Sequence, residues 1–181
     1  MKRRLFLTGP IGCGKSTAIA AALGDKTQRC GGFRTRRYRE PRLHFTLESP
    51  DGQCRETFLD FPDGKPRLNL EVFSRLGASL LEGDVLVLDE IGGIELLCPE
   101  FTAELERILE TDIPILGVMK GEGPAGALVE ALGLTGEYER AAARLRNRLR
   151  NDGNTLLYEC GRFDEQARRL AEQWVKEYAH E

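Results

Sequence analysis

The chain has 181 residues, of which 41% are hydrophobic and 30% charged, and its 26 basic and 29 acidic side chains give a net charge of −3. This composition is typical of a folded globular domain and excludes a disordered or fibrous chain. The mildly acidic balance does not indicate binding to a nucleic acid or to a membrane surface.

The N-terminal residues predict a buried strand followed by a helix. Residues 5–7 form an apolar run that ends at a glycine and a proline, as at the end of a buried strand. Residues 16–23 are rich in strong helix formers, and Gly24 is a typical helix stop. A glycine-rich loop therefore connects this strand to the start of the helix.

Residues 30–58 predict an antiparallel hairpin. Side chains of different polarity alternate along the first strand-like segment, and the turn sequence Ser-Pro-Asp-Gly occupies residues 49–52 between the next two segments. We interpret about residues 30–60 as a hairpin inserted into the fold of a single domain, residues 1–181.

The rest of the chain alternates between helices and strands. A helix with one apolar face is predicted from Asn69 to Gly83, and the aliphatic run at residues 85–88 is typical of a central parallel strand. Further strands are expected at residues 113–118 and 156–158, with helices near residues 101–109, 125–132, 137–150 and 164–179. This alternation indicates an α/β fold with a mostly parallel sheet, in which ligands bind at the carboxyl ends of the strands.

The loop after the first strand carries a phosphate-binding motif. Residues 9–16 read Gly-Pro-Ile-Gly-Cys-Gly-Lys-Ser and match the Walker A pattern, in which glycines let backbone N–H groups surround phosphate oxygens at a helix N-terminus. Lys15 is expected to act in catalysis by neutralising the β- and γ-phosphates, and the Ser16 hydroxyl to bind Mg²⁺. The residues expected to contact the nucleotide are Gly9, Pro10, Ile11, Gly12, Cys13, Gly14, Lys15, Ser16 and Thr17.

The aliphatic strand at residues 85–88 leads into an acidic pair, Asp89 and Glu90, which is a Walker B pattern. Side chains alternate along a strand, so the two acids are expected to face opposite sides and to act differently. Asp89 would hold Mg²⁺, directly or through water, and Glu90 would polarise an attacking water. A glutamate poised for water favours hydrolysis over phosphate transfer. Because no Asn/Thr-Lys-x-Asp motif for guanine occurs, we expect weak base selectivity.

At these residues the chain resembles the small nucleoside-triphosphatases known from thermophiles and from human. The similarity runs in order from about residue 3 to residue 131, and its most specific part is the segment Asp-Glu-Ile-Gly-Gly-Ile-Glu-Leu at residues 89–96. The resemblance implies a RecA-like P-loop NTPase fold with three layers. It also implies Mg²⁺-dependent hydrolysis of nucleoside triphosphates (ATP, GTP, CTP and UTP) to the diphosphate and phosphate.

Three segments depart from that family's pattern. Arg36 and Arg37 stand where the family has two acids, residues 133–147 read as an insertion of unassigned role, and Arg162 lies near the place of a family Asn-Arg pair. An arginine at the γ-phosphate can raise the rate of hydrolysis by about 10³–10⁵-fold. Arg39 and Arg162 are the candidates for such a residue.

Two alternatives stay open. In a P-loop kinase, the arginine-rich hairpin would grip a small-molecule or nucleic-acid acceptor, and in a nucleotide-gated binding module the nucleotide would order a partner surface. The five cysteines are scattered without a Cys-x-x-Cys pair, which indicates reduced thiols. Since the apolar run at residues 5–7 is too short for a signal peptide and no stretch could span a membrane, we expect a cytoplasmic monomer whose partners are nucleoside triphosphates.

Overall fold

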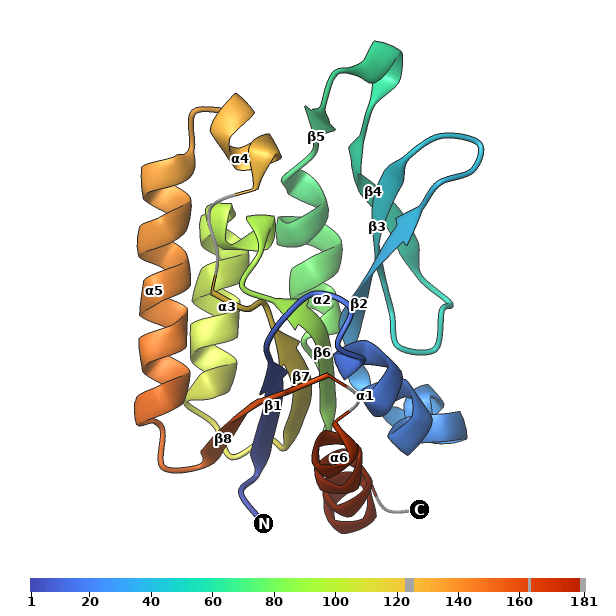
Figure 1. Cartoon of the computed structure of the whole chain (residues 1–181), viewed down its shortest axis with the longest axis vertical. Helices are drawn as coiled ribbons and strands as arrows, with labels where there is room; N and C mark the ends of the chain where they lie inside the picture. The colour runs from blue at the N-terminus through green and yellow to red at the C-terminus, as the bar shows by residue number, and fades with distance from the viewer. Residues whose placement is uncertain (123–125, 163, 180–181) are drawn as a thin grey trace.

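The apolar runs of the sequence pair into one eight-stranded sheet, in the order β5-β4-β3-β2-β6-β7-β1-β8 (Figure 1). The computed structural model describes residues 1–122, 126–162 and 164–179. Its strands are β1 Arg4–Thr8, β2 Gly31–Tyr38, β3 His44–Glu48, β4 Arg55–Asp60, β5 Arg67–Leu68, β6 Leu86–Ile91, β7 Ile115–Met119 and β8 Thr155–Glu159. Its α-helices are α1 Lys15–Leu23, α2 Ala78–Leu80, α3 Pro99–Leu109, α4 Ala127–Ala131, α5 Thr135–Asn151 and α6 Glu165–Tyr178. Shorter helical turns are η1 Gly24–Arg29, η2 Pro62–Gly64, η3 Phe73–Gly77 and η4 Ile94–Leu97.

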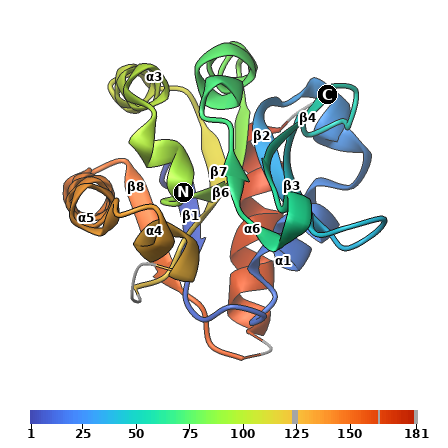
Figure 2. The ribbon, with the colours of Figure 1, turned by 90° about the horizontal axis from the view of Figure 1, so that it is seen from above.

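Five neighbouring strands, β2, β6, β7, β1 and β8, run parallel. The central strands are buried on both faces because helices cover each side of the sheet (Figure 2). Side chains of α1 and α6 pack on one face, and those of α3, α5 and η3 pack on the other. The predicted α/β arrangement of three layers around a mostly parallel sheet is confirmed.

The predicted antiparallel hairpin is present and forms part of the main sheet. β2 pairs antiparallel with β3 on one side and parallel with β6 on the other, so β3, β4 and β5 extend the main sheet at its edge. Gly32 permits this close pairing, since a Cβ at that residue would lie 2.0 Å from the Val87 carbonyl oxygen. The predicted turn at residues 49–52 does connect β3 to β4, with the amide of Gly52 donating to the carbonyl of Ser49.

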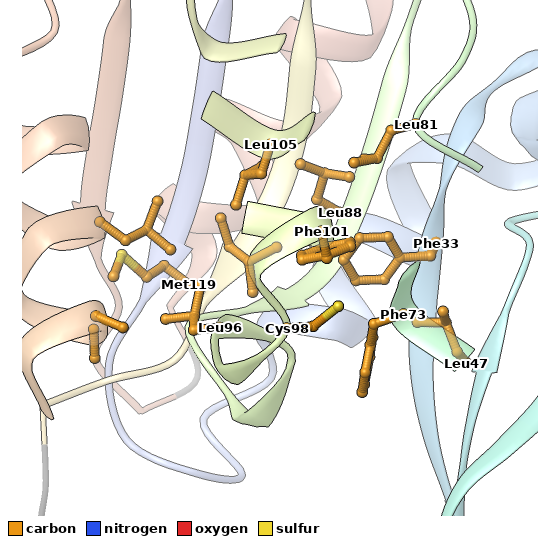
Figure 3. Close-up of a cluster of buried hydrophobic side chains, with 14 of the residues drawn as sticks. Phe33, Leu47, Phe73, Leu81, Leu88, Leu96, Cys98, Phe101, Leu105 and Met119 are labelled. Atoms are coloured by element: carbon orange, nitrogen blue, oxygen red, sulfur yellow. The ribbon is translucent and has the colours of Figure 1, made fainter. Parts of the chain in front are cut away.

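Aromatic side chains fill the layer between the sheet and α3 (Figure 3). The Phe33 and Phe101 rings lie 5.6 Å apart between centroids, and the Phe73 and Phe101 rings 5.9 Å apart. On the opposite face, Trp174 is fully buried and its indole nitrogen donates to the Arg3 carbonyl at 2.9 Å. Packing on both faces therefore holds β1 and β6 rigidly, and the carboxyl ends of these strands carry the two nucleotide motifs.

Several element boundaries differ from those expected. The helical segment after Asn69 ends at Leu80, three residues before Gly83, and it passes through the π-helical turn η3. The helix expected from residue 125 begins at Ala127 in α4, and residue 125 itself lies outside the described residues. Within the described ranges, none of the helices has the length and hydropathy needed to cross a bilayer.

Candidate active site

The Walker A loop lies at the carboxyl end of β1 and leads directly into α1. All three of its glycines adopt backbone conformations that other residues rarely reach, with φ of 125° at Gly9, 77° at Gly12 and 100° at Gly14. A Cβ at Gly9 would also lie 2.6 Å from the Cys160 carbonyl oxygen. Glycine is thus required both to turn the loop and to let it pass the segment after β8.

Lys15 holds its ammonium group within this loop. Its Nζ donates to the carbonyl oxygens of Gly9 at 2.9 Å and of Pro10 at 2.8 Å, and the residue is only 8% exposed. The charge is therefore fixed beside the amides of the loop and the N-terminus of α1, all of which attract an anion.

Ser16 and Asp89 join the Walker A loop to the end of β6. The Ser16 hydroxyl donates to Oδ1 of Asp89 at 2.7 Å, although the two residues are 73 positions apart. Burial raises the pKa of the Asp89 carboxyl, and the Ser16 hydrogen bond and the charges of Arg36, Arg34 and Lys15 act against that rise.

This hydroxyl and carboxylate fit a magnesium ion. Both supply the hard oxygen ligands that Mg²⁺ prefers, and Mg²⁺ in nucleotide sites uses one or two carboxylates together with water and substrate phosphates. No group of three or more His, Cys, Asp or Glu side chains suited to a metal occurs in the part of the chain that the structure describes.

Glu90 borders a cavity of about 900 Å³ together with the Walker A loop. The two acids contact different surroundings: Asp89 accepts the hydrogen bond from Ser16 at the start of α1, and Glu90 lines the cavity. Burial raises the pKa of the Glu90 carboxyl, and the charges of Lys120 and Lys15 partly oppose the rise. A half-buried carboxylate with a raised pKa, next to a space that admits water, is suited to accept a proton from water.

Residues from distant parts of the chain line the cavity. Its lining residues are Thr8, Gly9, Pro10, Ile11, Gly12, Gly14, Lys15, Ser16, Thr17, Glu90, Lys120, Gly121, Glu122, Tyr138, Arg146, Arg150, Leu157 and Glu159. All the expected nucleotide contacts line it except Cys13, whose side chain is buried in the same apolar cluster as Cys160. Their roles in binding and catalysis stay predictions.

Nine of the lining residues were not expected from the sequence, among them Lys120, Tyr138, Arg146 and Arg150. The Lys120 ammonium lies 5.5 Å from the centroid of the Tyr138 ring, and the Tyr138 hydroxyl donates to the Gly92 carbonyl at 3.0 Å. Lys120 directly follows β7, so the rule that ligands bind at the carboxyl ends of parallel strands could have identified it. No local sequence pattern identifies Tyr138, Arg146 and Arg150, the residues of α5, as part of the cavity lining.

The structure does not bring Arg39 or Arg162 to the cavity. Both are exposed, and neither lines it. Along β2 the arginines divide between the two faces: Arg34 is in register with Asp89, whereas the Arg37 guanidinium lies 5.8 Å from the centroid of the Phe45 ring. The arginine-rich strand is therefore not one continuous basic surface.

Glu95 supports the loop that follows the Walker B strand. Its carboxylate accepts hydrogen bonds from the amides of Gly92 at 2.6 Å and Gly93 at 2.8 Å. The residue is buried, and burial raises the pKa of its carboxyl to about 7. It therefore fixes the backbone of the loop that follows Glu90.

We expect the pH dependence of stability to change in Glu95→Gln. A folded-state pKa near 7, above the ordinary value of 4.5, means that the folded state binds the proton more tightly than the unfolded state. This group then lowers the free energy of unfolding by about 3 kcal/mol as pH rises from 4.5 to 7. Glutamine stays neutral and can still accept both amides. Urea unfolding at pH 5 and pH 8 measures this effect. The free energy of unfolding of the variant, relative to that of wild type, should increase with pH. Parallel pH dependences of the two proteins would contradict the raised pKa of Glu95.

Comparisons with known proteins identify relatives of the chain. The NTPase family model matches residues 4–154. The chain is 33% identical over 129 residues to nucleoside-triphosphatase THEP1 of Thermotoga petrophila, covering 65% of this chain and 72% of that protein. It is 30% identical over 184 residues to the cancer-related nucleoside-triphosphatase homolog of Mus musculus, covering 87% and 94%.

Two solved structures share the fold. The crystal structure of THEP1 from the hyperthermophile Aquifex aeolicus matches with a TM-score of 0.63 at 18% identity, covering 98% of this chain and 99% of that one. The solution structure of a human cancer-related nucleoside triphosphatase matches with a TM-score of 0.64 at 23% identity, covering 96% of each chain. At these identities the likeness concerns the fold alone.

Proposed function

Because the chain belongs to the NTPase family and is therefore a nucleoside-triphosphatase, we propose that it hydrolyses ATP, GTP, CTP and UTP with weak base selectivity in a Mg²⁺-dependent reaction. The family match confirms the resemblance seen in the sequence. The observation that carries the proposal is the 2.7 Å contact between Ser16 and Asp89, which joins the phosphate loop to the strand that bears Glu90.

The phosphate loop would bind the triphosphate through its backbone. Its amides and the N-terminus of α1 present N–H donors and a positive dipole end to the phosphate oxygens. Lys15 adds a fixed positive charge at the β- and γ-phosphates. Because these contacts address the phosphates and not the base, they support weak base selectivity.

Ser16 and Asp89 would hold Mg²⁺ through the hydroxyl and carboxylate oxygens. A bound Mg²⁺ would neutralise negative charge on the β- and γ-phosphate oxygens. The burial of Asp89, which is 6% exposed, keeps its carboxylate in one orientation toward Ser16.

Glu90 would accept a proton from the attacking water. As that proton leaves, the water oxygen forms a bond to the γ-phosphorus, and the bond from the γ-phosphorus to the bridging oxygen breaks, which releases the diphosphate and phosphate. The charge of Lys120 beside Glu90 helps to keep the carboxylate ionised before this transfer.

We also propose that one copy of the chain, residues 1–181 as a single domain, forms a complete site. The support is that the cavity lining runs from Thr8, at the end of β1, to Glu159, at the end of β8, within one chain.

Phosphate release from the four nucleotides tests the function. With Mg²⁺, purified protein is expected to release phosphate from ATP, GTP, CTP and UTP with kcat/KM values within about tenfold of each other, since the expected contacts address the phosphates that all four share. EDTA is expected to abolish turnover and added Mg²⁺ to restore it. Tight nucleotide binding without phosphate release would favour a nucleotide-gated binding module. Labelled phosphate moved onto an added acceptor, with no release to water, would favour a kinase.

A further inference from the structure

The phosphate cavity has a second wall that the Walker motifs do not supply. Helix α5 lies beside β8 on the face of the sheet opposite α1 (Figure 2). Arg146 and Arg150, one helical turn apart on α5, both line the cavity that the Walker A loop lines from the other side. Two guanidinium groups thus border the same space as Lys15 and Glu90.

Arg146 has donors that the protein leaves available. Its side chain is only 17% exposed, yet its described partners are distant: Nε lies 3.4 Å from Glu122 and Nη2 donates to the Lys120 carbonyl at 3.5 Å. A guanidinium carries five N–H donors in a planar fork that matches phosphate oxygens. A nearly buried arginine at a cavity wall, with two long contacts, is suited to bind an anion inside that cavity.

Glu122 is the shared partner of both arginines. Its carboxylate lies 3.4 Å from Arg146 and 2.8 Å from Arg150. The Glu122 side chain is 63% exposed, and an exposed ion pair of this kind contributes little energy. A phosphate group carries more negative charge than one carboxylate, so it can replace Glu122 at the two guanidiniums.

The position of Arg146 points to the terminal phosphate and not to the other two. Arg146 contacts the carbonyl of Lys120, and both residues line the same cavity as Glu90, the residue expected to activate water. The arginine therefore shares the cavity wall with the groups that would face the phosphate under attack.

We propose that Arg146 and Arg150 bind the terminal phosphate of the nucleoside triphosphate and that Glu122 competes with that phosphate for the two guanidiniums. This inference rests on the proposed function. The arginines donate hydrogen bonds to phosphate oxygens and form no covalent bond. Positive charge placed there stabilises the negative charge that develops as the phosphate is transferred to water. The proposal also gives a role to the segment 133–147, most of which lies in α5.

The same helix provides a matched control. Arg148 lies between the two arginines in sequence but points elsewhere: its Nη2 donates to the Leu109 carbonyl at 3.1 Å, and its Nε lies 3.8 Å from Glu106. It does not line the cavity. Arg148→Gln therefore removes the same charge from the same helix without touching the proposed contact.

The experiment compares full-length Arg146→Gln, Arg150→Gln, Glu122→Gln and Arg148→Gln with wild type. Calorimetry measures binding of adenylyl imidodiphosphate and of ADP, both with Mg²⁺, and phosphate release from ATP measures kcat. Loss of a charge-assisted contact in Arg146→Gln should weaken binding of the triphosphate analogue about 10–100-fold. It should also lower kcat about 10²-fold. ADP affinity should stay within about twofold because ADP lacks the terminal phosphate. Arg150→Gln should change the same quantities in the same direction.

Glu122→Gln is expected to act in the opposite direction, tightening binding of the triphosphate analogue about threefold by removing the competing charge. Arg148→Gln should match wild type. Thermal unfolding checks that each variant is folded. If Arg146→Gln does not fold, Arg146→Lys replaces it, because lysine keeps the charge without the planar fork. Arg146→Lys should bind the triphosphate analogue more weakly and ADP as tightly as wild type.

Unchanged analogue binding and kcat in the Arg146 variant would overturn the inference. So would equal losses for the analogue and ADP, or weaker analogue binding in Glu122→Gln. If wild type itself releases no phosphate, the proposed function fails. If wild type hydrolyses ATP and the Arg146 variant behaves like it, only the assignment of the arginines fails.

Discussion

Replacing Glu90 with glutamine is expected to lower kcat for NTP hydrolysis by about 10²–10⁴-fold, the usual contribution of a positioned general base. Glutamine keeps the size of the side chain beside the Walker A loop but cannot accept the proton of the attacking water. Binding of a non-hydrolysable analogue should remain within about threefold of wild type, because the contacts of the loop and of Lys15 to the phosphates are unchanged.

The pH profile of kcat provides a second measure of the same residue. Burial raises the pKa of the Glu90 carboxyl above the ordinary glutamate value of 4.5. Only the ionised form can act as a base, so wild-type kcat should decline as pH falls through this raised pKa, and the decline should begin at a higher pH than for an exposed glutamate. The residual activity of Glu90→Gln should lack this acidic limb.

Glu172→Gln is the matched control for Glu90→Gln. Glu172 lies on α6, where it accepts a hydrogen bond from Arg168 at 2.8 Å, on the opposite face of the sheet from α5. This variant should retain wild-type kcat. A Glu90→Gln protein that releases phosphate at more than about half the wild-type rate would remove Glu90 from the mechanism.

The parts of the site that the sequence predicts are those encoded by local pattern. The Walker A loop combines glycines required by positive φ at Gly9 and Gly14 with a lysine held within the loop, so neighbours in the sequence determine its geometry. The aliphatic residues of β6 predict a buried central strand, and Asp89 comes directly after this aliphatic run. The contact of Asp89 with Ser16 needs only that both motifs lie at the carboxyl edge of one parallel sheet.

The wall formed by α5 could not be predicted in the same way. Its periodicity predicts a helix, but arginines occur on several faces of that helix, and tertiary packing decides which of them face the cavity. Burial of Tyr138, Leu145 and Leu149 sets the rotation of α5, which directs Arg146 to the cavity and Arg148 toward α3. Similarly, alternation along β2 was visible in the sequence, but its simultaneous pairing with β3 and β6 depends on long-range register.

Replacing Lys15 with methionine is expected to lower kcat/KM for ATP by about 10³-fold, because the ammonium would make charge-assisted contacts to two phosphates, each of substantial energy. Methionine has a similar length and leaves the positive φ of the loop glycines untouched, so the folded state should persist, as thermal unfolding can check. Lys26→Met is the control. Lys26 lies in η1, beyond the C-terminal end of α1, and its ammonium donates to the Ala179 carbonyl at 2.9 Å. This variant should keep the wild-type kcat/KM. Since Lys15 carries the positive charge that the loop itself encloses, a Lys15→Met protein with kcat/KM within about threefold of wild type would mean that the triphosphate binds elsewhere than in this loop.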